Sequence, residues 1–444
     1  MFETAPLVHA GLSEAEAANK AARFQAADEA LDRLGTDRRE RWSLWVPGRI
    51  EVLGKHTDYA GGRSLVCALE RGLAVRVAAR RDNLVRVRSL DRLSTFETSL
   101  TVTASGEPGA WNQYVATVVR RVALNFSDVT RGADIVLSGD LPADAGMSSS
   151  SALVVAVFIA LSKSNELRSH VTFRSTISSS EELAAYLGAV ENGLAFRQLG
   201  AGVGVGTYGG NQDHTAILCS EPGQVARYSW DPLKRETLVP VPAGHVFALG
   251  ASGVHAPKAG AAMAKYNKVS LAARKLLELW NQDSGRADTS LGAALAVPEA
   301  GERLIALSGR PSVDHFAPGY LRGRLAQFVA ETFDIIPVAT DALTRGDLAE
   351  FGSVVDQSQE LAERNLENQV PETVTLQRSA RELGAVAASA FGAGFGGSVW
   401  ALVPEPDGDR FLRAWKSRYE ERHPGPAREA AFFLSRAGPH AYQF

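Results

Sequence analysis

The sequence predicts a mixed α and β protein of two to three domains. Its 444 residues exceed the roughly 100–200 residues of one typical domain. Segments with the alternation of β-strands are interleaved with amphipathic helical segments along the whole chain, which is typical of α and β folds. The composition, with 45% hydrophobic and 22% charged residues, is that of an ordinary globular protein.

In the first half of the chain, the elements follow from local patterns. An Ala-rich helical segment opens the chain before Gly35, and the apolar segment 44–53 predicts a strand that leads into a glycine-containing loop. Two alternating segments, 75–79 and 85–88, flank turn residues and predict a β-hairpin. Further on we expect a strand at 134–137, a loop at 139–146, a helix that opens with serines, and a second helix at 181–199.

In the second half, helices dominate. Composition places the domain boundary near residues 220–242, and we divide the chain into domains 1–225 and 226–444. Amphipathic spacing predicts helices at 261–282, 321–344 and 373–389, separated by loops at 283–298 and 309–318. A glycine cluster at 392–397 then leads into a strand at 398–403.

Charge and cysteine content exclude several kinds of function. The 47 Lys and Arg residues nearly balance the 50 Asp and Glu residues, for a net charge of −3, so we expect no nucleic-acid partner. Cys67 and Cys219 are isolated, which argues against a disulfide framework or a zinc site and indicates a reducing cytoplasm. The longest apolar run, residues 152–161, falls well short of the roughly 20 residues that cross a bilayer. We therefore also expect no membrane contact.

Four segments have the composition of a binding or catalytic site. Residues 141–152 place a glycine and a serine run between a strand and a helix, which suits a phosphate; a serine cap with nothing bound explains the segment equally well. Gly392, Gly394 and Gly397 fit a Gly-x-Gly-x-x-Gly pattern, but a helix precedes them and a strand follows, so we reject a dinucleotide fingerprint in favour of a tight turn. Residues 47–59 are rich in hydrogen-bonding side chains, as polyol sites are.

The fourth segment contains Asp213 behind a glycine-rich stretch, where its carboxylate could face a reacting hydroxyl. An aspartate in a turn is more often structural, and His56 or Asp58 taken singly would more often cap a loop. Together, however, the four segments resemble the GHMP small-molecule kinases and, within them, the galactokinases. Residues 49–62 resemble the galactokinase signature, 141–152 the phosphate motif and 391–398 the glycine-rich third motif.

The resemblance implies a two-domain α+β fold. Its N-terminal domain would be ribosomal-S5-domain-2-like, its C-terminal domain ferredoxin-like, and its active site would lie in the cleft between them. The implied activity is ATP-dependent phosphorylation of the anomeric hydroxyl of galactose, with ATP and Mg²⁺ as cofactors. The implied partners are the sugar and ATP alone, for a monomer or weak dimer.

The resemblance also assigns roles to individual residues. Asp213 would be the catalytic base and Arg49 would pair with it and with the transferring phosphoryl group. The residues expected to bind the sugar are Lys55, His56, Asp58, Gly210 and Tyr266. Those expected to bind the nucleotide are Gly146, Ser148, Ser149, Ser150 and Ser151. Ser150 and Glu191 would hold Mg²⁺, with Ser149 able to exchange roles with Ser150.

Three departures from the family pattern leave alternatives open. Lys55 stands where galactokinases usually carry Glu, so it either donates to the C6 hydroxyl or indicates another acceptor, such as galacturonate or L-arabinose. Residues 210–214, which read Gly-Asn-Gln-Asp-His, replace a more apolar segment of the family. Glu191 and Asp213 lie 22 residues apart, roughly ten more than the family pattern under ordinary loop variation, and the surplus falls at 200–209. The alternative hypothesis from a different functional class is a catalytically silent sugar sensor.

Overall fold

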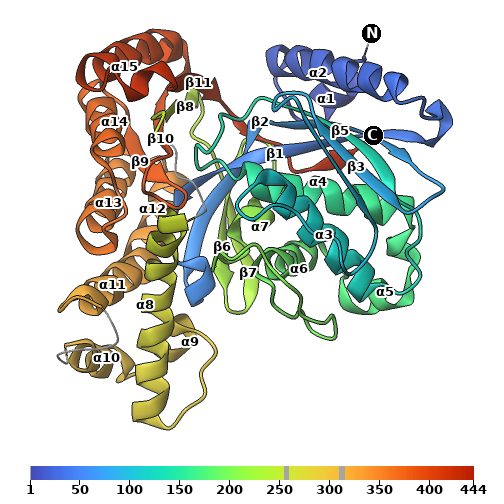
Figure 1. Cartoon of the computed structure of the whole chain (residues 1–444). Coiled ribbons are helices and arrows are strands. Elements are labelled where there is room, and N and C mark those ends of the chain that lie inside the picture. The colour runs from blue at the N-terminus through green and yellow to red at the C-terminus, as the bar shows by residue number, and fades with distance from the viewer. Residues whose placement is uncertain (1, 255–259, 310–315) are drawn as a thin grey trace.

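Two β-sheets organise the computed structural model, which describes residues 2–254, 260–309 and 316–444 (Figure 1). Within these residues, the larger sheet has nine strands and the smaller has four. The strands of the larger sheet are β1 (Arg41–Leu53), β2 (Arg63–Ala79), β3 (Leu84–Ser89), β4 (Ser94–Ser99), β5 (Ala133–Gly139), β6 (Gln224–Trp230), β7 (Leu233–Pro240), β12 (Ala437–Gly438) and β13 (Tyr442–Gln443).

The main path of the larger sheet runs β13-β1-β2-β5-β3-β4, with β6 and β12 also pairing β2 and with β7 pairing β6. The expected hairpin of segments 75–79 and 85–88 is therefore wrong, because β5 lies between β2 and β3 and pairs with both. The turn instead closes over the start of β5, where Gly132 exchanges backbone hydrogen bonds with Arg80 and Asp82. Since β5 is buried along almost its whole length, it needs a hydrogen-bonded neighbour on each edge.

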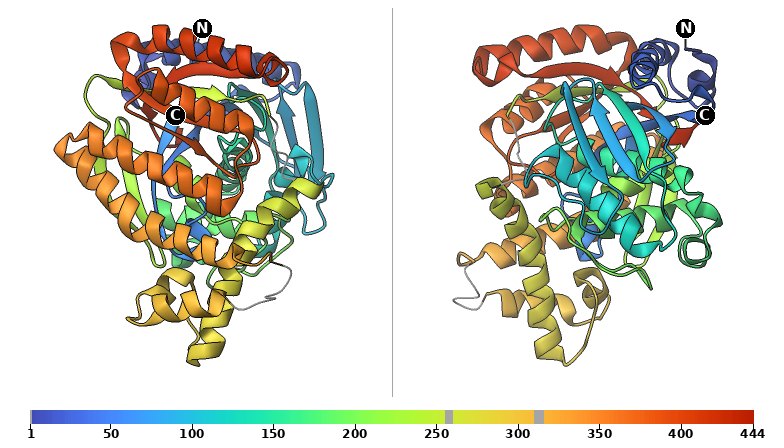
Figure 2. Two further views of the ribbon diagram at one scale, coloured as in Figure 1. Left: turned by 90° about the vertical axis from the view of Figure 1, so that its left-hand side faces the viewer. Right: turned by 45° about the vertical axis from the view of Figure 1, so that its right-hand side comes forward.

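Helices cover both faces of the larger sheet. In Figures 1 and 2, the two blue N-terminal helices lie above it and the green helices below it. The upper pair is α1 (Ala5–His9) and α2 (Glu14–Arg33). The lower layer comprises α3 (Trp111–Asn125), α4 (Ser149–Ser164), α5 (Val171–Thr176), α6 (Ser180–Asn192) and α7 (Gln212–Cys219). The largest apolar core lies between the sheet and this lower layer. The expected helix 181–199 ends at Asn192, because Gly193 adopts a left-handed φ of 76°.

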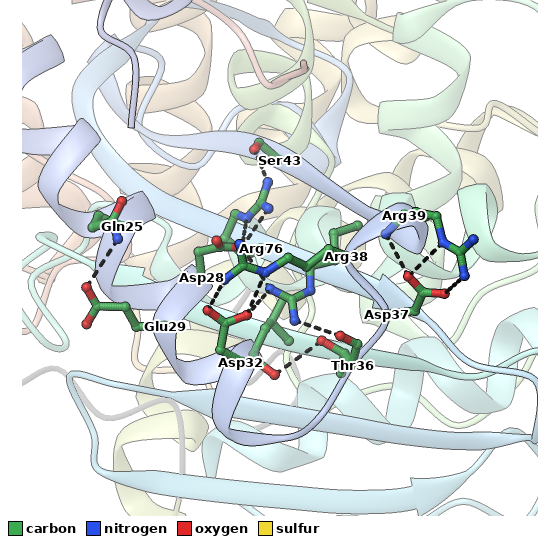
Figure 3. A network of polar contacts seen from close by, with 12 residues as sticks. Gln25, Asp28, Glu29, Asp32, Thr36, Asp37, Arg38, Arg39, Ser43 and Arg76 are labelled. Atoms are coloured by element: carbon green, nitrogen blue, oxygen red, sulfur yellow. Dashed lines mark hydrogen bonds and ion pairs between the residues drawn. The ribbon is translucent and has the colours of Figure 1, made fainter. Parts of the chain in front are cut away.

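A polar network fastens α2 to the strands beneath it (Figure 3). Asp28 accepts hydrogen bonds from Nε and an Nη of Arg76 on β2 at 3.0 and 2.6 Å. Arg76 also donates to Ser43 Oγ on β1 at 2.6 Å. An apolar seam, in which Phe24 and Ala17 are buried with Trp45, lies beside it. The N-terminal helix is thus an integral layer of the fold.

The smaller sheet contains β8 (His245–Ala251), β9 (Ala387–Phe391), β10 (Ser398–Pro404) and β11 (Ala431–Ser435). All its pairs are antiparallel, in the order β11-β8-β10-β9, and helix α15 (Gly408–Arg422) connects β10 to β11. With helices between β8 and β9 as well, this is the split βαββαβ arrangement of a ferredoxin-like domain. The expected two-domain α+β fold is confirmed.

Side chains on the two faces of the smaller sheet alternate between two cores. Along β10, Val399 and Ala401 pack with α15 and with α14 (Pro371–Glu382), on the outer left of Figure 1. Trp400 and Leu402 point the other way, into a core shared with α12 (Ile336–Arg345), α13 (Leu348–Leu361) and strands β1 and β2. This shared core joins the two sheets.

The remaining helices form a layer at the lower left of Figure 1: α8 (Gly260–Ser284), α9 (Leu291–Leu295), α10 (Ala300–Ser308) and α11 (Tyr320–Val329). The expected helix 321–344 corresponds to α11 and α12, joined through a π-helical stretch. The expected helix 373–389 ends at Glu382, and its last residues belong to β9. Part of the expected loop 309–318 lies outside the described residues.

The division at residues 225 and 226 stays a prediction. The two sheets themselves would suggest a division after Pro240, with β12 and β13 returning to the larger sheet at the end of the chain. Among the helices of the described residues, none combines the length and apolarity that a bilayer span requires.

Candidate active site

A cavity of about 500 Å³ lies where the two sheets meet, within the size range of small-molecule sites. Its wall collects segments that are far apart in the sequence: β1, the loop before α4, the start of α7, helix α8 and the glycine cluster after β9. The expected site residues that line it are Arg49, His56, Asp58, Gly146, Ser148, Ser149, Ser150, Ser151, Glu191, Gly210, Asp213 and Tyr266. Lys55 is absent from this wall.

Arg49 and Asp213 form an ion pair at the cavity wall. Arg49 projects from β1, and Asp213 lies in the first turn of α7, so that Nε donates to Oδ1 at 2.8 Å. The same guanidinium donates to the backbone oxygen of Gly146, in the loop before α4. Arg49 is buried, whereas the Asp213 side chain keeps 22% of its surface exposed. The carboxylate is therefore held by a charge-assisted hydrogen bond and is still accessible from the cavity.

Glu51 follows Arg49 on the same side of β1 and is almost completely buried. Its Oε2 accepts from Nε2 of Gln212 at 2.5 Å, and Gln212 in turn accepts from Ser64 Oγ. Oε1 of Glu51 has no hydrogen-bond partner in the described part of the chain. Burial raises the pKa of this carboxyl to about 7, although Arg49 and Lys55 act in the opposite direction.

The turn after β1 presents His56 and Asp58 to the cavity. His56 Nδ1 accepts from the Tyr59 hydroxyl at 2.9 Å, and Nε2 lies 3.1 Å from the Ala393 backbone oxygen. This pattern requires the proton on Nε2. Burial lowers the pKa of His56 to about 4, so the imidazole is neutral near pH 7. The Tyr266 ring lies 5.7 Å from the His56 ring, between centroids.

Asp58 connects this turn to the segment before α7. Its Oδ2 accepts from the backbone N–H of Gln212 at 3.1 Å, and burial raises its pKa to about 6. Gly210 lies against the same carboxylate so closely that a side chain at this position would overlap it. A glycine at position 210 thus lets Asp58 approach the start of α7, the helix that contains Asp213.

Lys55 points away from the cavity into a buried polar cluster. Its Nζ donates to Ser389 Oγ on β9 at 2.7 Å and to Ser358 Oγ on α13 at 3.0 Å. Glu331 accepts from Ser358 and from the backbone N–H of Gly54. Burial lowers the pKa of the Lys55 ammonium, and the charge of Glu331 acts against this. In this structure Lys55 fastens the turn to the smaller sheet, and its role as a sugar ligand stays a prediction.

The loop before α4 has the geometry of an anion site. Ser148 adopts φ 60° at the N-cap, and its buried Oγ has no hydrogen-bond partner in the described residues. The first N–H groups of α4 have no acceptor within the helix, and its dipole favours negative charge there. The loop rests on the glycine cluster, since a Cβ on Gly392 would lie 2.8 Å from the Gly146 oxygen. Ser398 Oγ donates to the Ala145 oxygen at 2.6 Å.

The expected metal ligands lie at the same end of α4. Ser151 Oγ donates to Glu191 Oε2 at 3.1 Å, and His214 Nε2 lies 3.2 Å from that oxygen. Ser150, the residue first expected to share a metal with Glu191, lines the cavity as well. In the described parts of the chain, no three His, Cys, Asp or Glu side chains gather as a metal group. Hydroxyl and carboxylate oxygens nevertheless fit Mg²⁺, which keeps several waters and phosphate oxygens as its other ligands.

Several cavity residues escaped the sequence reasoning. Trp111 and Tyr114, one turn apart at the start of α3, and Arg92, in the turn after β3, line the wall. The signal that could have found the two aromatic residues is their spacing directly after a Gly- and Pro-containing loop. Thr207, from the glycine-rich segment before α7, also lines the wall, and no sequence pattern distinguished it.

Three family models match the chain in order. The galactokinase galactose-binding signature matches residues 37–79, the GHMP kinases N terminal domain matches 113–220, and the GHMP kinases C terminal model matches 339–421. These ranges include Arg49, Asp213 and the segment between them that forms the loop before α4.

Comparison with individual proteins agrees with these models. A galactokinase of Haemophilus influenzae (strain PittGG) is 38% identical over 115 residues, which cover 26% of this chain and only 30% of that relative. A galactokinase of Roseiflexus sp. (strain RS-1) is 27% identical over 398 residues, or 88% of this chain and 90% of the relative.

Solved structures share the fold. Lactococcus lactis galactokinase complexed with galactose has a TM-score of 0.78 at 23% identity, over 95% of this chain and 99% of that one. L. major mevalonate kinase in complex with R-mevalonate has a TM-score of 0.52 at 16% identity, over 89% and 96%. With both domain models matched around a cavity that holds the Arg49–Asp213 pair, the chain belongs to the GHMP kinases.

Proposed function

We propose that this chain is a sugar kinase that transfers the γ-phosphoryl group of ATP to the anomeric hydroxyl of galactose. The observation that carries the proposal is the Arg49–Asp213 pair, with 2.8 Å between Nε and Oδ1. It opens onto the same cavity as the sugar-signature turn and the serine loop. A base, a polyol wall and an anion site in one cavity are the parts that phosphoryl transfer to a sugar requires.

The chemistry follows from where the charges lie. Asp213 accepts the proton of the anomeric hydroxyl while the anomeric oxygen of the sugar attacks the γ-phosphorus. The new bond joins that oxygen to phosphorus, and the bond between the γ-phosphorus and the oxygen bridging to the β-phosphate breaks to release ADP. Arg49 holds Asp213 in place and offsets the negative charge that develops on the transferring group.

Two further sets of residues support the use of ATP. The start of α4, with Ser148 to Ser151 behind Gly146, offers N–H groups and hydroxyls to the phosphates. Trp111 and Tyr114, in the wall of the same cavity, supply aromatic surface on which the adenine of ATP can pack. We propose that Glu191 holds Mg²⁺ together with Ser151 or Ser150. When bound, the ion would neutralise the β- and γ-phosphate oxygens.

Galactose is the acceptor that the cavity favours. Lys55, the residue that suggested a uronic acid, gives no support for one, because its Nζ is engaged by Ser358 and Ser389 outside the cavity. The Haemophilus and Roseiflexus relatives are named galactokinases. The complete Arg49–Asp213 pair and serine loop favour a catalyst over a silent sensor. Because Cys67 and Cys219 are buried and unbonded, we propose that the protein works in a reducing cytoplasm. We also propose that it is a monomer or a weak dimer, which analytical ultracentrifugation would test.

The test is ADP release with galactose, L-arabinose, galacturonate and glucose, with the product identified by ³¹P NMR as an anomeric phosphate. We expect galactose to have the highest kcat/KM. Asp213→Asn, which keeps the shape but cannot accept the proton, should lower kcat by about 10²–10⁴-fold while ATP still binds. Asp37→Asn, the same change at an exposed turn, should leave kcat unaltered. Absence of turnover with every aldose would overturn the proposal.

A further inference from the structure

The glycine-rich segment before α7, residues 200–209, is here called the strap. It connects α6 to α7 without regular secondary structure, yet hydrogen bonds from α3 hold its first part. Asn125 Nδ2 donates to the Gly200 oxygen at 3.2 Å, and Gln113 Nε2 donates to the Val205 oxygen at 3.3 Å. The first part of the strap is therefore fixed to α3, whose first turn lines the cavity.

The second part of the strap is held by α8. Asn267 donates through Nδ2 to the Gly206 oxygen at 3.1 Å and accepts from the Tyr208 N–H at 3.0 Å. The Arg274 guanidinium lies 4.6 Å from the centre of the Tyr208 ring. The Asn267 side chain thus hydrogen-bonds the backbone on both sides of Thr207, and these two hydrogen bonds fix the position of Thr207.

Thr207 is a strap residue whose side chain can meet a ligand, since the other strap residue that lines the cavity, Gly209, has none. It is only 4% exposed and lines the cavity, and its hydroxyl makes no hydrogen bond within the described residues. A polar group in a buried wall normally has a partner, so this hydroxyl is available to a ligand. Its surroundings belong to the sugar side of the cavity, because a Cβ on nearby Gly209 would lie 3.1 Å from the Tyr266 hydroxyl oxygen.

We propose that Thr207 is a specificity residue whose Oγ1 hydrogen-bonds one ring hydroxyl of the bound aldose. The inference rests on the proposed sugar kinase function and adds a contact that the strap supplies. A polyol is recognised through several directional hydrogen bonds, and a wall hydroxyl that both donates and accepts suits one of its hydroxyls.

The experiment pairs Thr207→Val with sugars that each lack one hydroxyl: 2-deoxy-, 4-deoxy- and 6-deoxygalactose. Loss of one neutral hydrogen bond should lower kcat/KM for galactose by about 3- to 10-fold, with KM for ATP unchanged. For the one analogue that lacks the partner hydroxyl, the valine variant should show no further loss, whereas the other analogues should lose the same factor as galactose. Thr207→Ser should retain the wild-type pattern.

Asn267→Ala is the matched control, since it loosens the strap but keeps the Thr207 hydroxyl. It should lower kcat/KM by one factor on galactose and on every analogue. Wild-type kinetics in Thr207→Val, or an equal loss on galactose and all analogues, would overturn the inference. If the wild-type enzyme phosphorylated no aldose, the proposed function would fail instead. Calorimetry of galactose binding with a non-hydrolysable ATP analogue would then still measure the contribution of Thr207.

Discussion

The buried carboxyl of Glu51 predicts a stability that falls as the pH rises. Its pKa is about 7 in the folded chain, against an ordinary value of 4.5, and burial is the main cause. Between these two values the folded chain binds more protons than the unfolded chain. Stability therefore decreases from about pH 4.5 to about pH 7 and then levels off, as far as this group is concerned.

The magnitude follows from the two pKa values. At 1.36 kcal/mol per pH unit, the difference between 4.5 and about 7 corresponds to about 3 kcal/mol. Glu51→Gln removes the titration and keeps a side-chain oxygen that can accept from Gln212 Nε2, the present partner. Relative to wild type, we expect this variant to be more stable by about 3 kcal/mol at pH 8, by about 2 kcal/mol at pH 6, and by less than about 1 kcal/mol at pH 4.5.

Urea unfolding followed by tryptophan fluorescence at these three pH values measures the difference. Glu97→Gln is the control, because Glu97 is half-exposed and pairs with Arg86 at the surface, where such pairs contribute little. This control should follow the wild-type pH dependence. If Glu51→Gln did so too, with the two curves separated by a constant offset, Glu51 would not carry the buried proton and the reasoning would be refuted.

Two further predictions concern buried lysines. Lys20 on α2 is fully buried and pairs with Asp140, which also accepts from the Gly72 N–H at 2.8 Å and precedes the serine loop. Lys20→Met should raise KM for ATP by about 10-fold or more, because a hydrogen bond to a charged group contributes about 1.5–3 kcal/mol, and KM for galactose should change less than twofold. Equal changes in both constants would contradict a role at the loop. Lys55→Met should lower the melting temperature and alter KM for galactose and for L-arabinose, which lacks C6, by the same factor, because Nζ bonds Ser358 instead of lining the cavity. Unequal factors would place Lys55 at the sugar.

The fold could be predicted from the sequence where local pattern decides structure. The apolar segment that became β1, the helix that opens with serines and the strand after the glycine cluster are all marked by apolar composition and by the polar or glycine residues beside them. Strand order lacks such a signal. Nothing in the alternation of β2 and β3 reveals that β5, about fifty residues later, pairs between them, because pairing depends on which edges must be buried.

The site shows the same limit at the level of single side chains. The resemblance to the GHMP kinases implied that Arg49 and Asp213 are partners across 164 positions, and the structure brings them together. Which serine reaches Glu191 is decided by the rotation of about 100° per residue along α4, and Ser151 hydrogen-bonds its carboxylate. The direction of Lys55 depends on hydroxyls more than 300 positions away, so no local pattern could have indicated it.

The arrangement of the site also separates chemistry from substrate positioning. Arg49 and Asp213 both belong to the larger sheet and the helix layer on it, so no residue of the smaller sheet takes part in their hydrogen bond, although the Arg49 guanidinium lies 5.8 Å from the centre of the Phe391 ring at the end of β9. The sugar turn, in contrast, depends on the smaller sheet, since His56 bonds the Ala393 oxygen after β9 and Lys55 bonds Ser389 on β9. A change in the relative position of the two sheets would therefore move the sugar-binding side chains while leaving the base and its arginine paired. Substitutions in the contacts between the sheets should accordingly change KM for the sugar more than they change the pH dependence of the chemical step.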